Sequence, residues 1–316
     1  MSTLLDKAVS IELTYGCNLN CGYCYIPEKQ RTKKYDKYTV HVNAIAHCKK
    51  IVEELKRDDV RLKAVMLLSS EPTVLEADIL AICINILAER VNHVQIMTNG
   101  VNLANDEYYE MLMSKLGDGV KLTIGVTIDG YKELHDSTRD NSYDRANKTV
   151  DKLIADGMIE RINIVVGLEA IADTERFISW YKGYILSRNL SNIPSCIEPP
   201  IILKLEDRMK IMKLLRELRD LDGKEVGDAT ETCDDIHMLL SSKITTCTND
   251  CGTVGQKSGN LEKHNLKDLL VSRDMHKKIV NEECLTCDSS HICNVFCHWH
   301  QAPNGFAFNC AYNRAD

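Results

Sequence analysis

Apolar residues recur along the chain in two alternating patterns, one typical of strands and the other of helices. The stretch 64–68 is a short continuous apolar run, which favours a strand that is buried on both faces. Residues 40–57 instead carry apolar side chains three and four positions apart, the spacing of one helix face. The same patterns predict strands at 8–14, 64–68, 94–97, 122–128, 162–166 and, with a break, 193–203, and helices at 40–57, 74–90, 105–116, near 144–156, 173–187 and 206–221.

Six successive units of a strand followed by a helix predict an α/β fold with a parallel sheet and helices packed outside it. Periodicity alone allows either an open doubly wound sheet or a sheet that curls into a partial barrel. In both forms, ligands collect where the parallel strands end at their carboxyl edge. Beyond these units the periodicity stops and cysteines become frequent, so we predict two domains, 1–222 and 223–316.

Composition and charge exclude several classes of protein. The chain has 316 residues, of which 44% are hydrophobic and 27% are charged, ordinary values for a folded protein in water. The net charge is −7 without a basic block, so we do not expect nucleic acid as a main partner. No apolar run approaches the ~20 residues that a membrane span requires, and residues 1–6 lack the features of a secretion signal. We therefore expect a cytoplasmic protein without a membrane partner.

Cysteine usage is the most unusual feature of this composition. In a reducing cytoplasm, the 14 cysteines are expected to bind metal where they cluster rather than to form disulfides. Cys48 and Cys83 stand alone inside helical patterns, and we expect them to be small core residues.

Three cysteines with the spacing C-x-x-x-C-x-x-C follow the first predicted strand: Cys17, Cys21 and Cys24. A [4Fe–4S] cluster is normally held by four thiolates, one on each iron. Three thiolates from one loop would leave the fourth iron open, and an open iron is a site of reaction. The alternative is a zinc or redox loop, because C-x-x-C alone is common in both.

The loop resembles the signature of the radical S-adenosylmethionine (SAM) enzymes, with Tyr23 as its aromatic residue. In that family, SAM chelates the open iron, and electron transfer cleaves SAM to a 5′-deoxyadenosyl radical that abstracts hydrogen from a substrate. The resemblance implies that the sheet curls into a partial (β/α)6 barrel.

Other motifs of the family follow the predicted strands in the same order. Ser69-Ser70-Glu71-Pro72 stands where relatives have Gly-Gly-Glu-Pro, whose glutamate contacts the SAM amino group. Thr98-Asn99-Gly100 resembles the turn that contacts the ribose, and Thr127-Ile128-Asp129-Gly130 resembles a Ser-Ile-Asp-Gly motif. His135-Asp136-Ser137-Thr138-Arg139 matches a His-Asp-x-x-Arg pattern. Besides the cysteines, the resemblance implies a SAM site made of Tyr23, Ser70, Glu71, Asn99, Thr127 and Arg139.

The resemblance implies that Thr127 and Arg139 hold the SAM carboxylate, and a guanidinium, as an always-charged planar donor, suits that role. We expect Arg139→Ala to weaken SAM binding much more than it disturbs folding. Each motif also has a plainer interpretation, since Asn-Gly and Asp-Gly are common turn dipeptides. Taken singly, Glu71 fits a solvated loop acid and Arg139 fits a surface ion pair.

Eight further cysteines lie after residue 222: Cys233, Cys247, Cys251, Cys284, Cys287, Cys293, Cys297 and Cys310. The run C-x2-C-x5-C-x3-C and the cysteine that follows it resemble the SPASM domain, which carries two auxiliary iron–sulfur clusters. The resemblance assigns Cys284, Cys287, Cys293 and Cys310 to the outer cluster, and Cys247, Cys251 and Cys297 to the inner cluster. Either Cys233 completes the inner cluster or that cluster keeps an open iron. Structural zinc is the alternative for the whole region.

Radical SAM enzymes with such a domain modify peptides and proteins, and the auxiliary clusters can accept the electron that a substrate radical gives up. The resemblance implies a maturase of ribosomally made peptides that forms a crosslink, epimerises a residue or excises backbone. The alternatives are an anaerobic sulfatase maturase-like enzyme that generates formylglycine, a small-molecule dehydrogenase with the same clusters, and a non-catalytic metal-binding scaffold. No general base can be assigned, although Glu169, Glu198, Asp129 and Tyr25 are candidates by position.

The partners implied are a precursor peptide and an external electron donor of the flavodoxin or ferredoxin type. Many peptide maturases carry a leader-recognition domain ahead of the barrel. Here the cysteine loop begins at residue 17, which leaves no room for one. We therefore expect a separate protein to present the leader of the peptide, with an exposed strand edge as the docking mode.

Overall fold

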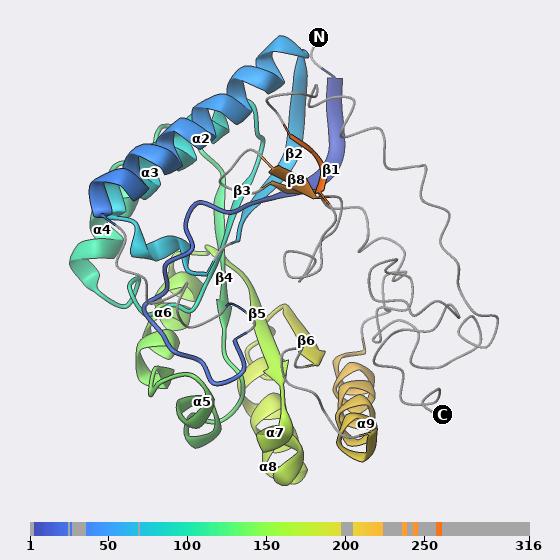
Figure 1. Cartoon of the computed structure of the whole chain (residues 1–316). Coiled ribbons are helices and arrows are strands. Elements are labelled where there is room, and N and C mark those ends of the chain that lie inside the picture. Colours follow the sequence, from blue (N-terminus) through green and yellow to red (C-terminus); the bar gives the residue numbers. More distant parts are fainter. Residues whose placement is uncertain are drawn as a thin grey trace, which may run out of the picture.

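A curved parallel sheet with helices on its outer side dominates the computed structural model, which describes residues 3–24, 26, 36–68, 70–196, 205–223, 236–238, 243–245 and 257–260 (Figure 1). The strands are β1 (Thr3–Ile11), β2 (Val60–Leu67), β3 (Val94–Thr98), β4 (Leu122–Thr127), β5 (Ile159–Val166), β6 (Asn192–Cys196), β7 (Ile236–Met238), β8 (Lys243–Thr245) and β9 (Lys257–Asn260). The helices are α2 (Lys37–Arg57), α3 (Ala77–Ala88), α4 (Asp106–Ser114), α5 (Lys132–Thr138), α6 (Tyr143–Ala155), α7 (Leu168–Ala172), α8 (Thr174–Trp180) and α9 (Leu205–Asp222), with the short 3-10 helix η1 (Pro72–Val74) and the π-helical η2 (Tyr181–Leu186).

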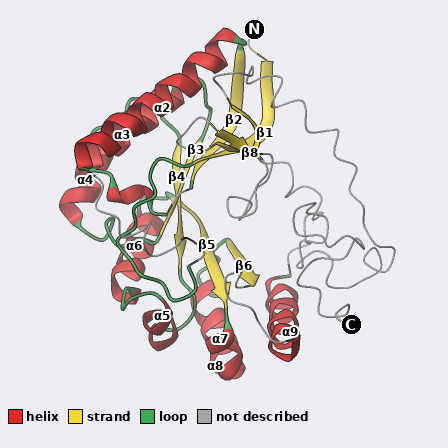
Figure 2. Ribbon diagram, viewed as in Figure 1, coloured by secondary structure: helices red, strands yellow, loops and turns green. Residues whose placement is uncertain are grey.

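Strand order decides between the two α/β forms that periodicity allows. The sheet runs β6-β5-β4-β3-β2-β1-β7-β8-β9, and β1 to β6 pair in parallel with their neighbours in chain order. A doubly wound sheet reverses direction at a switch point, and this order has none between β1 and β6. Right-handed crossovers that always step the same way place every helix on one side of the sheet. Figure 2 shows the result, an arc of strands with the helices on its convex side, which is consistent with a partial barrel.

Three short strands beyond residue 222 continue the sheet past β1. β7 pairs in parallel with β1, and β8 and β9 follow in antiparallel order. We predicted that a second domain begins after residue 222. The strands β7, β8 and β9 lie beyond that boundary and belong to the same sheet as β1. The eight cysteines predicted to hold auxiliary clusters lie outside the described residues.

Most predicted elements are present within a few residues of their expected bounds. The strand predicted at 8–14 begins earlier, at Thr3. The single helix predicted at 173–187 is α8 followed by η2. Helix α5 was not predicted, because it has only 7 residues and its buried face includes His135 and Thr138, which give no apolar periodicity.

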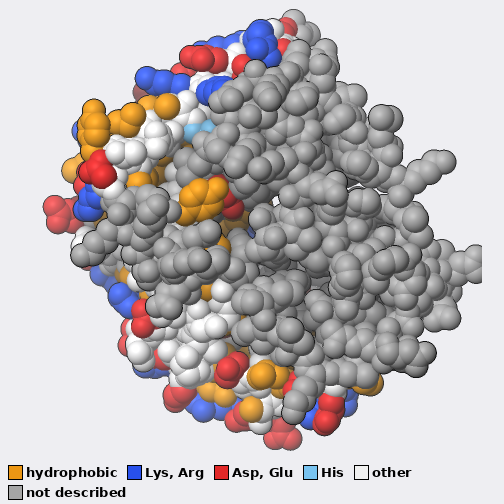
Figure 3. Space-filling view, in the orientation of Figure 1, with side chains coloured by type: hydrophobic (Ala, Val, Ile, Leu, Met, Phe, Trp, Pro, Cys, Tyr) orange, Lys and Arg blue, Asp and Glu red, His pale blue; other side chains and the backbone are white. Residues whose placement is uncertain are grey.

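The core lies between the sheet and the helices, and local sequence explains how the helices begin. Asp36 caps α2, and its carboxylate accepts a hydrogen bond from the Thr39 backbone at 2.8 Å. Cys48 on α2 and Cys83 on α3 are both fully buried, which confirms that they are core residues. Charges of both signs are mixed over the helical exterior visible in Figure 3. Among the described helices, none is both long and apolar enough to cross a membrane.

Gly100, at the turn after β3, has a backbone that only glycine adopts easily. Its φ is +79°, and a Cβ there would lie 3.0 Å from Val126 Cγ1 and 3.2 Å from the Ala146 backbone. We expect Gly100→Ala to lower the free energy of unfolding by about 1–3 kcal/mol, because it adds steric overlap to an unfavourable φ. Urea unfolding would measure the loss.

Gly119 is the matched control for this substitution. Its φ is +77°, but no atom lies within 4 Å of the position that a Cβ would take. Gly119→Ala therefore carries the φ cost alone. If the two variants lose equal stability, close packing at Gly100 contributes nothing.

Candidate functional site

The candidate site lies at the carboxyl edge of the sheet, where the first four strands end. Ile11 at the end of β1 pairs with Leu67 at the end of β2, and Leu67 pairs with Ile96 near the end of β3. This register keeps the strand ends level. The loops that leave them carry the cysteines, Glu71, Asn99 and Asp129, and these loops contact one another as described below.

The cysteine loop presents three half-buried free thiols, those of Cys17, Cys21 and Cys24. Burial raises the pKa of Cys17 to about 11; a hydrogen bond from the Leu19 backbone opposes the rise, and the charges of Glu71, Cys21 and Cys24 add to it. The charges of Cys21 and Cys24 thus act on Cys17 within the same loop. Three thiolates held together need a cationic partner, and the iron of a [4Fe–4S] cluster fits this donor set. In the described part of the chain, no three His, Cys, Asp or Glu side chains are grouped to hold a single metal ion.

Glu71 is a buried carboxylate held by four donors. Its Oε1 accepts hydrogen bonds from the backbone and hydroxyl of Thr73 at 3.0 and 2.6 Å, and from the hydroxyl of Thr98 at 2.6 Å. Its Oε2 accepts from the Asn99 backbone at 2.7 Å. Only 1% of Glu71 is exposed, and the described residues provide it with no ion pair. The carboxylate is therefore buried and fixed by neutral donors, so it is not a solvated loop acid.

Asparagine side chains connect the cysteine loop to the neighbouring loops. Asn99 Nδ2 donates to Asn18 Oδ1 at 2.7 Å and lies 3.9 Å from Cys17 Sγ. Asn18 in turn donates to Asn102, whose side chain donates to the Thr73 carbonyl at 2.7 Å. Sequence reasoning found Asn99 but missed Asn18 and Asn102. The only signal in the sequence for a role of these two residues was their position: Asn18 lies within the cysteine motif, and Asn102 lies just after Thr98-Asn99-Gly100.

Arg139 is buried and forms an ion pair with Asp129, so it is not part of a surface ion pair. Its Nη1 lies 3.4 Å from Asp129 Oδ2 and also donates to the hydroxyl of Tyr23, which donates to the same Asp129 oxygen. Burial raises the pKa of Tyr23 well above its usual range, so this hydroxyl remains a donor at neutral pH. The Nε of Arg139 is buried and has no hydrogen-bond partner among the described residues.

The histidine of the His-Asp-x-x-Arg pattern fixes the backbone that carries Arg139. Burial lowers the pKa of His135 to about 4, so its ring is neutral. Its Nδ1 accepts from the Asp129 backbone at 3.2 Å, which leaves Nε2 to donate to the Ser142 hydroxyl at 3.0 Å. Ser142 donates to the Arg139 carbonyl at 2.6 Å. The pattern therefore joins the loop after β4 to Arg139, the residue that directly follows α5.

The remaining predicted residues are less closely connected. The Ser70 hydroxyl donates to the Tyr15 carbonyl at 2.7 Å and so holds the loop after β2 against the cysteine loop. Thr127 is the half-buried last residue of β4 and pairs with Asn163 of β5.

Among the candidate general bases, the structure separates two. Asp129 is committed to Arg139, Tyr23 and the Val165 backbone, which makes it a structural partner of the arginine. Glu169 is exposed on α7. Tyr25 and Glu198 lie outside the described residues.

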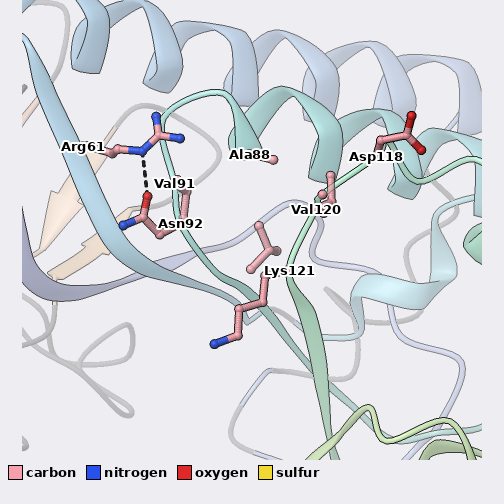
Figure 4. A pocket seen from close by; sticks show the side chains of 9 residues that line it. Arg61, Ala88, Val91, Asn92, Asp118, Val120 and Lys121 are labelled. Atoms are coloured by element: carbon pink, nitrogen blue, oxygen red, sulfur yellow. Dashed lines mark hydrogen bonds between the residues drawn. The ribbon is translucent and has the colours of Figure 1, made fainter.

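A cavity of about 360 Å³ opens at the opposite, amino edge of the sheet (Figure 4). Arg61 on its rim donates to Asn92 Oδ1 at 2.6 Å, while Asp118 and Lys121 extend in different directions. Its polar groups do not converge on one point. Because it lies at the opposite edge of the sheet, the cavity is separate from the candidate site, which is formed by the loops at the carboxyl edge.

Comparison with known families identifies the class of protein. Residues 11–180, which are 170 of the chain's 316, match the radical SAM superfamily. The chain belongs to this superfamily of enzymes, which implies a [4Fe–4S] cluster and SAM as cofactors.

Relatives of known function share part of the sequence. The mycofactocin maturase MftC of Mycolicibacterium smegmatis is 27% identical over 185 residues, covering 57% of this chain and 43% of that protein. The 7,8-dihydro-6-hydroxymethylpterin dimethyltransferase of Methanocaldococcus jannaschii is 28% identical over 124 residues, covering 39% of this chain and 22% of that protein. The chain thus spans less than half the length of these relatives.

Solved structures share the fold over almost the whole chain. The structure of anSMEcpe with bound AdoMet, which is SAM, and the Cp18Cys peptide superposes with a TM-score of 0.67 at 16% identity, covering 98% of this chain and 95% of that one. Streptococcus suis SuiB bound to the precursor peptide SuiA superposes with a TM-score of 0.61 at 15% identity, covering 97% and 75%. At these identities the likeness concerns the fold.

Proposed function

We propose that Cys17, Cys21 and Cys24 hold the [4Fe–4S] cluster and that the loops around them hold SAM. When bound, the cluster supplies the electron that cleaves SAM to the 5′-deoxyadenosyl radical. The observation that carries this assignment is a pair of buried, opposite charges, each connected to the cysteine loop through one residue. Glu71 is connected through Asn99, which lies against Cys17. Arg139 is connected through Tyr23.

The two charges match the two ends of the amino-acid part of SAM. Glu71 is fixed by neutral donors and has no ion pair among the described residues, so an ammonium group would compensate its charge. Arg139 has an unused Nε for a carboxylate, and a guanidinium binds a carboxylate through two parallel hydrogen bonds. In this assignment Asn99 lies near the ribose, and Thr127 assists Arg139.

The substrate that we propose is a ribosomally made precursor peptide, in which the radical forms a crosslink, epimerises a residue or excises backbone. Support comes from the likeness in fold to anSMEcpe and SuiB, whose structures contain peptides, and from the partial sequence match to a maturase. The cysteine run from Cys284 to Cys297 supports auxiliary clusters that accept an electron from the substrate radical. An external donor of the flavodoxin or ferredoxin type would reduce the first cluster.

A formylglycine-generating activity is the second candidate, because it uses the same cofactors on a peptide cysteine or serine. The two activities give different products. Formylglycine is an aldehyde that a hydrazide probe labels, whereas a crosslinked, epimerised or excised peptide is not labelled. A non-catalytic scaffold would cleave no SAM.

The test uses anaerobically reconstituted protein with a chemical reductant. We expect about twelve irons per chain, 5′-deoxyadenosine formation that depends on SAM, and modification of a peptide in mass spectra. Peptides would be supplied with and without a candidate leader-binding protein. About four irons with SAM cleavage would keep the radical chemistry and remove the auxiliary clusters. Zinc without cleavage would contradict the proposal.

A further inference from the structure

We propose that Tyr23 is a positioning residue whose hydroxyl, together with Asp129, orients Arg139 toward the carboxylate of SAM. The inference rests on the proposed SAM site and extends it from the arginine to the residues that aim it. In this inference the role of Tyr23 depends on its hydroxyl, so a phenylalanine at this position could not fulfil it.

The donors of Arg139 are divided between two directions. Nη1 faces Tyr23 and Asp129, whereas Nε is buried and has no hydrogen-bond partner among the described residues. A guanidinium is planar and its donors form a rigid fork. Fixing one end of the fork therefore fixes the direction in which the remaining donors point, and those donors stay available for a ligand.

Asp129 is a rigid base for this arrangement. It is 1% exposed, its Oδ1 accepts from the Val165 backbone at 2.9 Å, and its own backbone N–H donates to His135 at 3.2 Å. The bond from Val165 fixes the carboxylate, and the bond to His135 fixes the backbone that carries it. Its second oxygen, Oδ2, accepts a hydrogen bond from the Tyr23 hydroxyl and forms the ion pair with Arg139, whose charge it balances.

Tyr23 brings the cysteine loop into the same unit, since it lies between Cys21 and Cys24. Its hydroxyl donates to Asp129 and accepts from Arg139. A second link, from the Gly22 backbone to the Thr138 carbonyl at 3.1 Å, does not involve the hydroxyl. Phenylalanine at position 23 would thus keep the loop attached to α5 and lose only the two hydroxyl bonds.

The experiment compares Tyr23→Phe with wild type and with Tyr109→Phe. Tyr109 is a matched control: its hydroxyl donates to the Asp156 carboxylate at 2.5 Å, and Lys152 lies 4.8 Å over its ring. Tyr23 has the same two kinds of partner: its hydroxyl donates to the Asp129 carboxylate, and the guanidinium of Arg139 lies 5.9 Å from the centre of its ring. Both substitutions remove one tyrosine–aspartate hydrogen bond, but Tyr109 lies on α4, and its side-chain partners among the described residues are Asp156, Met158 and Lys152 rather than predicted SAM residues.

We expect Tyr23→Phe to raise the KM for SAM about tenfold, with the rate of 5′-deoxyadenosine formation at saturating SAM within about twofold of wild type. Iron content should stay unchanged, and the SAM-induced change in the electron paramagnetic resonance spectrum of the reduced cluster should require more SAM. Tyr109→Phe should leave all of these values at wild type. Asp129→Asn is the second variant; because it also breaks the buried ion pair with Arg139, its KM, which we expect to rise in the same way, is read together with its thermal unfolding.

Three outcomes would overturn the inference: an unchanged KM in Tyr23→Phe, an equal rise in Tyr109→Phe, or loss of iron in Tyr23→Phe. The last would assign Tyr23 to cluster assembly rather than to SAM binding. Failure of the proposed function looks different, because the wild-type protein itself would then cleave no SAM.

Discussion

Replacing Cys21 with alanine is expected to abolish SAM cleavage and to remove about four irons per chain. The physical reason is that three thiolates are the fewest that can hold the cluster while one iron stays open. Losing one leaves two ligands from this loop. The measurement is 5′-deoxyadenosine formation by chromatography, paired with iron analysis of the same anaerobic sample. We expect the same result for Cys17→Ala and Cys24→Ala.

Cys83→Ala is the control for this prediction, because it removes a thiol that is fully buried between helices and far in sequence from the loop. We expect it to keep both iron and cleavage, with only the small loss of stability that a truncated core side chain causes. Iron bound elsewhere in the chain should be the same in all variants. Cleavage retained by Cys21→Ala would contradict the assignment of the cluster site.

The second large effect concerns the charge of Arg139. The expectation from sequence, that Arg139→Ala weakens SAM binding much more than folding, changes once Asp129 is seen beside it. Asp129 is 1% exposed and pairs with Arg139, so removing the arginine leaves a buried carboxylate without its partner. Breaking such a pair typically costs about 3–5 kcal/mol of folding free energy. A single substitution would therefore disturb folding and SAM binding together.

The double variant Arg139→Gln with Asp129→Asn separates the two effects. It removes both charges at once and leaves polar groups that can still hydrogen-bond each other and Tyr23. We expect its midpoint of thermal unfolding to recover most of what Arg139→Gln alone loses. Binding of SAM should nevertheless fall at least ~100-fold, about 2.8 kcal/mol, because the carboxylate of SAM loses its cation.

Equilibrium binding of SAM to the reconstituted protein, read together with thermal unfolding, checks this prediction. A double variant that is stable and binds SAM as tightly as wild type would place the carboxylate site elsewhere. A double variant no more stable than Arg139→Gln would show that the buried pair with Asp129 is not what the single substitution breaks.

Much of the fold could be predicted from local sequence. Short continuous apolar runs such as residues 64–68 are typical of buried strands, and helix α2 has both an apolar face and a capping aspartate, Asp36. Such signals depend only on residues that are close in the chain, so one sequence is enough to detect them. The seven-residue helix α5 escaped because it is short and its buried face includes the polar residues His135 and Thr138, which give no apolar periodicity.

The sequence by itself determined which residues are candidates for the site. Spacing predicted Cys17, Cys21 and Cys24 as one ligand set, and the resemblance to the family's motifs, in their order along the chain, predicted Glu71, Asn99 and Arg139. These are properties of residue type and of distance along the chain.

Only the tertiary structure decided how these residues act on one another. It showed that the strands run in unbroken order, that Glu71 is held by donors from the loops after β2 and β3, and that Tyr23, Asp129 and Arg139 form one buried group. Tyr23 and Arg139 are 116 positions apart in sequence. The reason is physical: burial and pairing of charges depend on which strand ends meet at one edge of the sheet, and no local pattern carries that information.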